Sequence, residues 1–282
     1  MARYFPTMKI KNISNGEVDD MYNVHGHALN LCRTPILTCL RRIIDLKSTY
    51  KEGDPVQIAD FGTADGRASL TLFNEMIDII QADLGKDQPI VVYHNDQPRN
   101  DFNILSSVIQ GDENSSGLAI SRNVYPVMLA RTMYEQCLPN DTLDLSISSI
   151  AGHYLSKHVC QIKNGVFMGE ADESEQTLMR EQGKSDWRDF VMSRGRELKP
   201  GGFLITINVT SDEENNVVSQ LDKGMHHLGS FVTDMTRERV ITQAEYLAIN
   251  FNGHYLRKPA DFKEPFTSEV LKYESLDWNW CL

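Results

Sequence analysis

Residues 57–70 read QIADFGTADGRASL, an apolar run followed by a turn that holds two glycines and two acids. The run 55–62 is typical of a buried strand that ends at a glycine. Residues 67–85 place apolar side chains at helical spacing up to Gly85, which predicts a helix directly after the turn.

The same alternation of strand and helix continues along the chain. Strand-like runs occupy 88–96, 142–150 and 201–209, and a second helical segment occupies 100–110. Strands that alternate with helices predict an α/β fold, with a mostly parallel sheet and helices on both faces. In such sheets, ligands bind at the carboxyl ends of the strands.

Two regions break this alternation. Residues 163–195 are acidic and then helical. The chain after about residue 210 predicts helices near 214–228 and 236–250, followed by an irregular tail that contains prolines. Segments of this kind suit a lid over one edge of a sheet.

The two regions that interrupt the alternation predict the domain boundaries. A chain of 282 residues is long enough for one large α/β domain with an appended segment. We expect a core over 1–210 that carries a cap insertion near 155–190. Residues 211–282 are then expected to form a partial helical cap.

Composition limits the partners of the chain. A net charge of −11 disfavours nucleic acid and anionic membrane surfaces, and no stretch approaches the roughly 20 apolar residues that cross a bilayer. The N-terminal residues lack the apolar core of a secretory signal. Five scattered cysteines without a CxxC pair indicate reduced thiols and no metal site. We therefore expect a cytoplasmic protein.

The acidic turn predicts the kind of ligand. Asp60 and Asp65 lie beside Gly62 and Gly66, in a G-x-x-x-G spacing that differs from the dinucleotide pattern. Two carboxylates repel a pyrophosphate but attract a cationic group. S-adenosylmethionine supplies such groups through its α-amino group and its sulfonium. The alternative is a tight turn that binds nothing.

A second acid, Asp96, ends the next predicted strand, 34 residues beyond Gly62. Nucleoside-binding α/β folds place an acid there to bind the ribose hydroxyls, usually after about 20 residues. The longer spacing requires an extended helix and loop. The alternative is an ordinary Asn-Asp turn before Pro98.

Several motifs together resemble a known family. Residues 95–103 read NDQPRNDFN, residues 133–157 read MYEQCLPNDTLDLSISSIAGHYLSK, and residues 186–205 read DWRDFVMSRGRELKPGGFLI. In order and spacing they are similar to the plant-type SABATH methyltransferases, over about residues 20–275. The resemblance implies a Rossmann-like sheet with an α-helical cap and S-adenosylmethionine as the methyl donor.

With the acidic turn, the resemblance implies a set of cofactor-binding residues. Asp60 and Gly62 would lie by the methionine moiety, and Asp96 by the ribose. The remaining residues would lie beside the adenine, on the strand next to the methyl donor and the methyl acceptor, or on the N-terminal segment. The full set is Tyr22, Gly26, Asp60, Gly62, Asp65, Asp96, Gln97, Thr132, Met133, Ser149 and Ile150.

The resemblance also implies how an acceptor is held. The family's carboxylate-binding glutamine falls on Leu29, and its tryptophan falls on Tyr154, which follows His153. A tyrosine hydroxyl can donate to a carboxylate as an indole N–H does. We expect His153 and Tyr154 to contact a small carboxylic acid; the alternative is that both residues only pack the strand's end.

These features favour a carboxyl O-methyltransferase. A carboxylate is already ionised at neutral pH, so catalysis needs positioning rather than a general base. An N-methyltransferase of the same fold and a non-catalytic cofactor-binding protein are the alternatives. The resemblance implies two more strands after the cap, and because no further strand-like pair follows it, we expect the last two strands to be absent, either because the chain is shortened or because they are dispensable. An exposed fifth strand would be an unpaired edge, which favours association and makes a homodimer one assembly to consider.

Overall fold

A computed structural model describes residues 26–47, 53–111, 117–118, 123–211, 221–249 and 253–267. The chain divides into two compact units. The core unit comprises the described residues up to 151 together with 192–207. The second unit comprises 152–191 together with the described residues from 208 onward.

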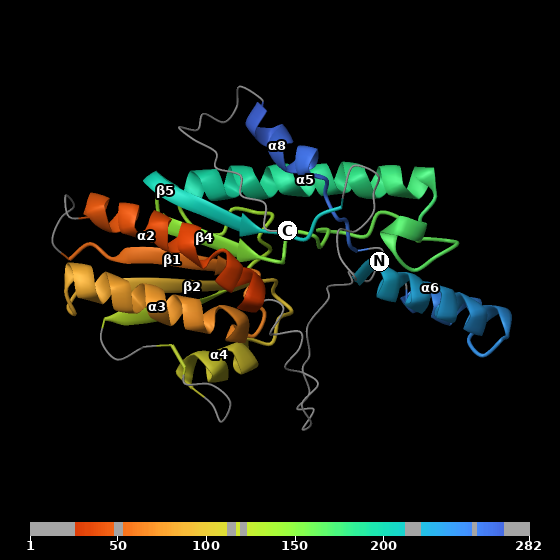
Figure 1. Cartoon of the computed structure of the whole chain (residues 1–282), viewed down its shortest axis with the longest axis horizontal. Coiled ribbons are helices and arrows are strands. Elements are labelled where there is room, and N and C mark those ends of the chain that lie inside the picture. Colours follow the sequence, from red (N-terminus) through yellow and green to blue (C-terminus); the bar gives the residue numbers. More distant parts are fainter. Residues whose placement is uncertain are drawn as a thin grey trace. The chain divides into compact units, whose positions relative to one another are not determined.

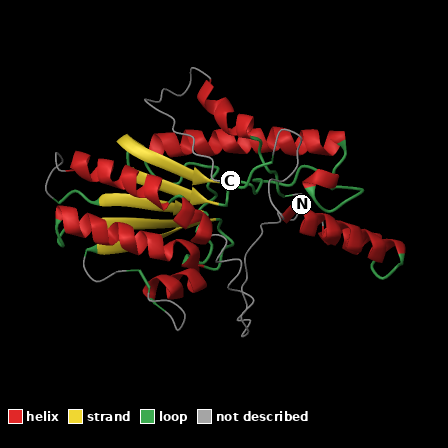
Figure 2. Ribbon diagram, viewed as in Figure 1, coloured by secondary structure: helices red, strands yellow, loops and turns green. Residues whose placement is uncertain are grey.

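The core unit is built on a five-stranded sheet in the order β3-β2-β1-β4-β5, in which every pairing is parallel (Figures 1 and 2). Its strands are β1 Val56–Phe61, β2 Ile90–Asp96, β3 Val124–Ala130, β4 Leu143–Ser149 and β5 Leu198–Ile207. The predicted α/β class and parallel sheet are confirmed. Among the described strands, β3 and β5 form the two edges.

Helices α2 Arg33–Lys47, α3 Arg67–Leu84 and α4 Phe102–Gln110 belong to the same unit. Alternate residues of the strands, such as Ile58, Val92 and Ile147, pack with apolar residues of these helices in one core. The α3 helix begins after Gly66 and ends before Gly85, both with positive φ. The sequence analysis predicted α3 and α4 closely but did not identify α2.

The edge strand β3 was missed because Pro126 interrupts its apolar run. Proline removes one ladder donor, which argues against a central strand. In the structure β3 pairs only with β2, and Val92 lies opposite Pro126. An edge strand has a side without ladder partners, where a proline is tolerated.

Strand β5 begins at Leu198, three residues before the predicted start. Leu198 pairs with Leu143, and pairing resumes between Phe203 and Leu145, so the residues between them form a bulge. Gly202 lies in this bulge and packs against three backbone carbonyl oxygens. A Cβ at this position would lie only 3.0–3.1 Å from them. The Lys-Pro-Gly-Gly run is therefore an insertion inside the strand and not its boundary.

The second unit is mainly helical. Its elements are η1 Met168–Glu170, α5 Glu173–Glu197 (whose last six residues belong to the core unit), α6 Leu221–Arg237, α7 Gln243–Ile249 and α8 Pro259–Thr267.

Helices were predicted at 214–228 and 236–250. The end of the first helix and the start of the second were both predicted wrongly. α6 continues through Gly229 to Arg237. A Cβ at Gly229 would lie 2.4 Å from Glu170 Oε1, so a larger residue does not fit there. This glycine therefore serves close packing and does not end the helix. α7 then starts after Thr242, whose backbone N–H donates to the Glu245 carboxylate while its hydroxyl accepts from the Glu245 N–H, a capping box. Residues 212–220 and 250 lie outside the described residues.

The tail was also predicted to be irregular, whereas α8 forms there. Pro259 occupies the first helical position, where its missing N–H costs nothing. Phe262 is buried edge-on against Trp187, and the Trp187 indole donates to the Phe262 carbonyl at 3.0 Å. Tertiary packing therefore stabilises a short helix that contains a second proline, Pro265. Within the described residues, no helix has the length and hydropathy needed to span a bilayer.

Residues 26–31 are helical, and Leu29 is 3% exposed within the core. Replacing Leu29 with glutamine would remove a buried apolar side chain and bury an amide. We expect Leu29→Gln to lower the free energy of unfolding by about 2–4 kcal/mol. Leu31, 54% exposed, provides the control: Leu31→Gln should change stability by less than about 0.5 kcal/mol. Urea denaturation measures both, and equal midpoints would contradict the burial of Leu29.

Candidate functional site

The turn between β1 and α3 is held by hydrogen bonds to the end of β2. The backbone N–H groups of Gly62 and Thr63 both donate to the Asn95 carbonyl, at 2.9 and 3.0 Å. The Ala64 N–H donates to Asp96 Oδ2 at 2.7 Å. Because these amides are used within the chain, the turn is not an amide cradle for a phosphate.

Both glycines of the turn are required by close packing of the chain itself. Gly62 has a φ of +80°, and a Cβ there would lie 2.3 Å from the Cβ of Ala151. Gly66 has a φ of +85°, and its Cβ would lie 2.8 Å from Leu105. Glycines in a turn after a strand can also serve the close approach of a ligand to the backbone. The structure gives a different reason, because Ala151 and Leu105 occupy the space.

Asp60 is buried near the end of β1, and its carboxylate accepts a hydrogen bond from the Ser69 hydroxyl at 2.6 Å. Burial raises the pKa of Asp60, and the Ser69 hydrogen bond opposes the rise. His94 pairs with it in register on β2 and is 1% exposed. Burial lowers the pKa of His94 to about 4, so the imidazole is neutral at physiological pH. Neither ring nitrogen of His94 has a hydrogen-bond partner among the described residues.

Asp96 bridges the β1 turn and the end of β2. Its Oδ2 accepts from the Ala64 N–H and its Oδ1 from the Gln97 N–H, both at 2.7 Å. Burial raises the pKa of Asp96 to about 6, although both backbone hydrogen bonds lower it. Two carboxylate oxygens offer about four acceptor sites, so Asp96 retains capacity for ligand hydroxyls.

Asp65 differs from the other two acids because Arg67 compensates its charge. Asp65 Oδ2 accepts from Arg67 Nη1 at 2.7 Å, and Oδ1 accepts from the Arg67 N–H at 3.1 Å. Asp60 and Asp96 have no such cationic partner among the described residues.

The end of β4 is strained. Ile150 has a φ of +50°, which is rare for a β-branched residue, and its N–H donates to the Ile207 carbonyl at 2.7 Å. The neighbouring Ser149 hydroxyl is buried and has no hydrogen-bond partner among the described residues. Backbone strain of this kind concentrates at functional sites, and the place of Ser149 and Ile150 beside the ligand stays a prediction.

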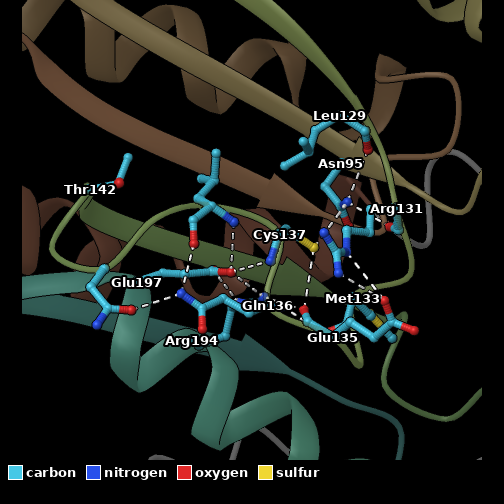
Figure 3. Close-up of polar contacts among 12 residues, drawn as sticks. Asn95, Leu129, Arg131, Met133, Glu135, Gln136, Cys137, Thr142, Arg194 and Glu197 are labelled. Carbon is cyan, nitrogen blue, oxygen red and sulfur yellow. Dashed lines mark hydrogen bonds and ion pairs between the residues drawn. The ribbon is translucent and has the colours of Figure 1, made fainter.

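Thr132 and Met133 lie in the loop that follows β3, and the core unit secures this loop with residues that the sequence analysis did not identify. Asn95 Nδ2 donates to the carbonyls of Leu129 and Arg131, at 3.0 and 2.8 Å. A buried ion pair from the end of α5 also binds the loop (Figure 3). The signal was present in the RxxE spacing of residues 194–197.

The N-terminal positions are only partly covered by the structure. Tyr22 lies outside the described residues. Gly26 lies beside the first turn of α3, since a Cβ there would be 3.8 Å from the Ala68 carbonyl oxygen. Leu29, which takes the place of the family's glutamine, is buried in the core and presents no polar group.

In the second unit, His153 and Tyr154 form an aromatic cluster with His254. The ring centroids of His153 and Tyr154 are 4.3 Å apart, and those of Tyr154 and His254 are 4.7 Å apart. An antiparallel bridge joins Tyr154 to His254. The buried Arg257 guanidinium donates to the carbonyls of Gly152 and Gly183, which fixes the start of this segment. Sequence analysis missed His254 because its 100-residue separation from Tyr154 conceals the contact.

Comparison with known proteins assigns the family. A family model described as SAM dependent carboxyl methyltransferase matches residues 19–271, and the chain belongs to this family. The resemblance inferred from the motifs is thereby confirmed, as is the family's dependence on S-adenosylmethionine.

Individual relatives are more distant. The chain is 26% identical to Methyltransferase LUC1 of Fusarium sp over 196 residues, which cover 68% of this chain and 51% of the relative. It is 21% identical to jasmonate O-methyltransferase of Arabidopsis thaliana over 318 residues, covering 96% and 79%. A solved structure of loganic acid methyltransferase with SAH has a TM-score of 0.73 at 19% identity, covering 92% of this chain and 75% of that one, which shows the shared fold. The chain spans about half the length or less of the first curated relatives.

The raised pKa of Asp96 predicts a pH dependence of stability. Between the ordinary pKa of 3.8 and the folded value of about 6, the folded protein binds the proton more tightly than the unfolded chain does. The contribution of Asp96 is therefore fully present below about pH 4 and is lost as pH rises through 6, by up to about 3 kcal/mol. Asp96→Asn cannot titrate, so wild-type stability relative to this variant should fall between pH 4 and 7. Urea unfolding across this range measures the difference, and parallel curves would refute it.

Proposed function

We propose that this chain transfers the methyl group of S-adenosylmethionine to a carboxylate oxygen of a small organic acid. The observation that carries the proposal is the pair of acids, buried Asp60 and half-buried Asp96, at the carboxyl ends of adjacent parallel strands in a member of this family. The relatives named for jasmonate and loganic acid act, by their names, on small carboxylic acids or their derivatives. The protein is proposed to act in the cytoplasm.

The residues of the core unit fit this cofactor. Asp96 has acceptor capacity for the ribose hydroxyls, and Asp60 adds negative charge that suits an ammonium and a sulfonium. The Ser149 hydroxyl at the end of β4, which has no hydrogen-bond partner among the described residues, is a further polar group suited to a ligand. Thr132, Met133 and Gln97 would flank the nucleoside, and Gly26, Gly62 and Ile150 would shape the backbone around it. Asp65 would contribute less charge, because Arg67 pairs with it.

The mechanism requires little acid–base chemistry from the chain. When bound, S-adenosylmethionine supplies an electrophilic methyl group. The acceptor carboxylate is ionised at neutral pH, so no side chain has to remove a proton. His153 and Tyr154 would donate hydrogen bonds that hold the carboxylate, and fixing the acceptor in this way can supply roughly 7–11 kcal/mol of the barrier. Neutral donors orient a carboxylate without stabilising its charged ground state as strongly as an arginine pair does.

The second unit is proposed to act as a cap over the acceptor. Its aromatic cluster offers one phenol and two imidazoles as donors. A methyl-transfer assay with labelled S-adenosylmethionine tests the proposal on a panel of small carboxylic acids and neutral nitrogen heterocycles. Transfer to acids supports it. Transfer only to heterocycles, or cofactor binding without any transfer, would overturn it.

Asp96→Ala should weaken binding of S-adenosylhomocysteine at least tenfold, because it removes the proposed ribose acceptor and the bond to the Ala64 N–H. Asp101 is a nearby control, since its carboxylate only caps α4 by accepting from the Asn103 and Ile104 N–H groups. Calorimetry should show unchanged affinity for Asp101→Ala. Equal affinities of wild type and Asp96→Ala would remove the ribose assignment.

Tyr154→Phe should slow methyl transfer while cofactor affinity stays within about twofold of wild type, because it removes a hydroxyl proposed to hold the acceptor and not the cofactor. Tyr125 is 53% exposed on β3, and Tyr125→Phe serves as the control with unchanged turnover. Steady-state kinetics with the best acid of the panel gives both values. Full turnover in Tyr154→Phe would exclude its hydroxyl from acceptor binding.

A further inference from the structure

The loop 131–138, which leads from β3 toward β4, is held at several points by one buried ion pair (Figure 3). The pair consists of Arg194 and Glu197 in the last turn of α5. Both side chains are 0% exposed, and Arg194 Nε donates to Glu197 Oε2 at 2.7 Å. A second bond joins Arg194 Nη2 to Glu197 Oε1 at 2.8 Å, so the contact is bidentate.

Each member of the pair binds a different part of the loop. Arg194 donates to the carbonyl of Met133 at 2.7 Å and to that of Glu135 at 3.0 Å. Glu197 Oε1 accepts from the backbone N–H groups of Cys137 and Leu138. The guanidinium therefore binds the first half of the loop, and the carboxylate binds the second half.

The same pair is connected to the ligand edge of the sheet. The Arg194 guanidinium carbon lies 3.9 Å from the centroid of the Phe61 ring, and Phe61 directly precedes the Gly62 turn. On the loop's other side, the Arg131 N–H donates to the Asp96 carbonyl at 3.0 Å. The loop is thus fixed relative to the ends of β1 and β2, where an α/β sheet binds a nucleoside.

A buried ion pair contributes little net stability, because desolvation of both charges offsets their attraction. Four hydrogen bonds to the backbone of one loop, in contrast, fix its conformation in detail. We propose that Arg194 and Glu197 are positioning residues that hold the loop 131–138 in the shape that binds the nucleoside end of the cofactor. This inference rests on the proposed function, and it assigns to the pair a role in cofactor affinity.

A double variant separates this role from simple stabilisation. Arg194→Met with Glu197→Met removes both charges together and leaves side chains of similar length, a change that is often tolerated at buried pairs. The exposed pair of Arg188 and Glu264, joined at 2.7 Å, gives a matched control as Arg188→Met with Glu264→Met. Arg194→Lys is the second variant: it keeps a charge beside Glu197, but one ammonium cannot reproduce the guanidinium's fork of hydrogen bonds.

Calorimetry with S-adenosylhomocysteine and with its inosine analogue, in which an oxygen replaces the adenine amino group, gives the main readout. We expect the Arg194/Glu197 double variant to bind S-adenosylhomocysteine at least tenfold more weakly and to lose most of the wild-type preference for adenine over hypoxanthine. The control double variant should match wild type. If the double variant does not fold, Arg194→Lys should show the same loss of preference.

Hydrogen exchange gives a readout that does not depend on the cofactor. Amides of the loop, Cys137 and Leu138 above all, should exchange at least tenfold faster in the Arg194/Glu197 variant, while those of β1 stay protected. The inference would be overturned if the variant kept the wild-type preference for adenine over hypoxanthine. It would also be overturned if the loss of thermal stability accounted for the whole loss of affinity. If wild type binds no S-adenosylhomocysteine, the proposed function fails. Slow loop exchange in the variant would by itself refute the positioning role.

Discussion

The turn after β1 and the end of β2 are joined by main-chain hydrogen bonds, and the geometry of the candidate site depends on this joint. The Asn95 carbonyl accepts from two turn amides, and the Asp96 carboxylate accepts from a third. Adjacent parallel strands end at the same edge, so the joint brings the acidic turn and Asp96 together. The same two β2 residues also bind the loop after β3, Asn95 through its side chain and Asp96 through its carbonyl. Three segments far apart in sequence are thereby fixed in one arrangement.

The charged groups at this edge have distinct surroundings, which give them distinct roles. Asp65 is compensated by Arg67, and Glu197 by Arg194. Asp60 is buried and Asp96 is half-buried, and desolvation raises the pKa of both carboxyl groups. A bound cation would relieve this cost, since an opposite charge favours the ionised form. The acids that are least satisfied within the chain are therefore those best suited to a sulfonium ligand.

The acceptor side departs from the family pattern in a consistent way. Leu29 is buried where the family's glutamine is expected, and Tyr154 stands in the tryptophan position. The aromatic cluster adds His254, which the bridge to Tyr154 holds in place. His153 and Tyr154 stay predicted acceptor contacts, and the cluster around them contains imidazoles and a phenol.

The sequence alone determined the parallel α/β class, the boundaries of α3 and α4, the acidic turn and the family. These features rest on local periodicity and on motifs of contiguous residues, which a linear reading contains. Tertiary structure decided the rest. Only packing shows that Pro126 is tolerated in an edge strand, that Gly229 serves contact with Glu170, and that Phe262 stabilises α8 against Trp187. The contacts of Arg194 with Met133 and of His254 with Tyr154 join residues 61 and 100 positions apart. No local pattern encodes such contacts, because their energy arises only when the folded chain brings the two segments together.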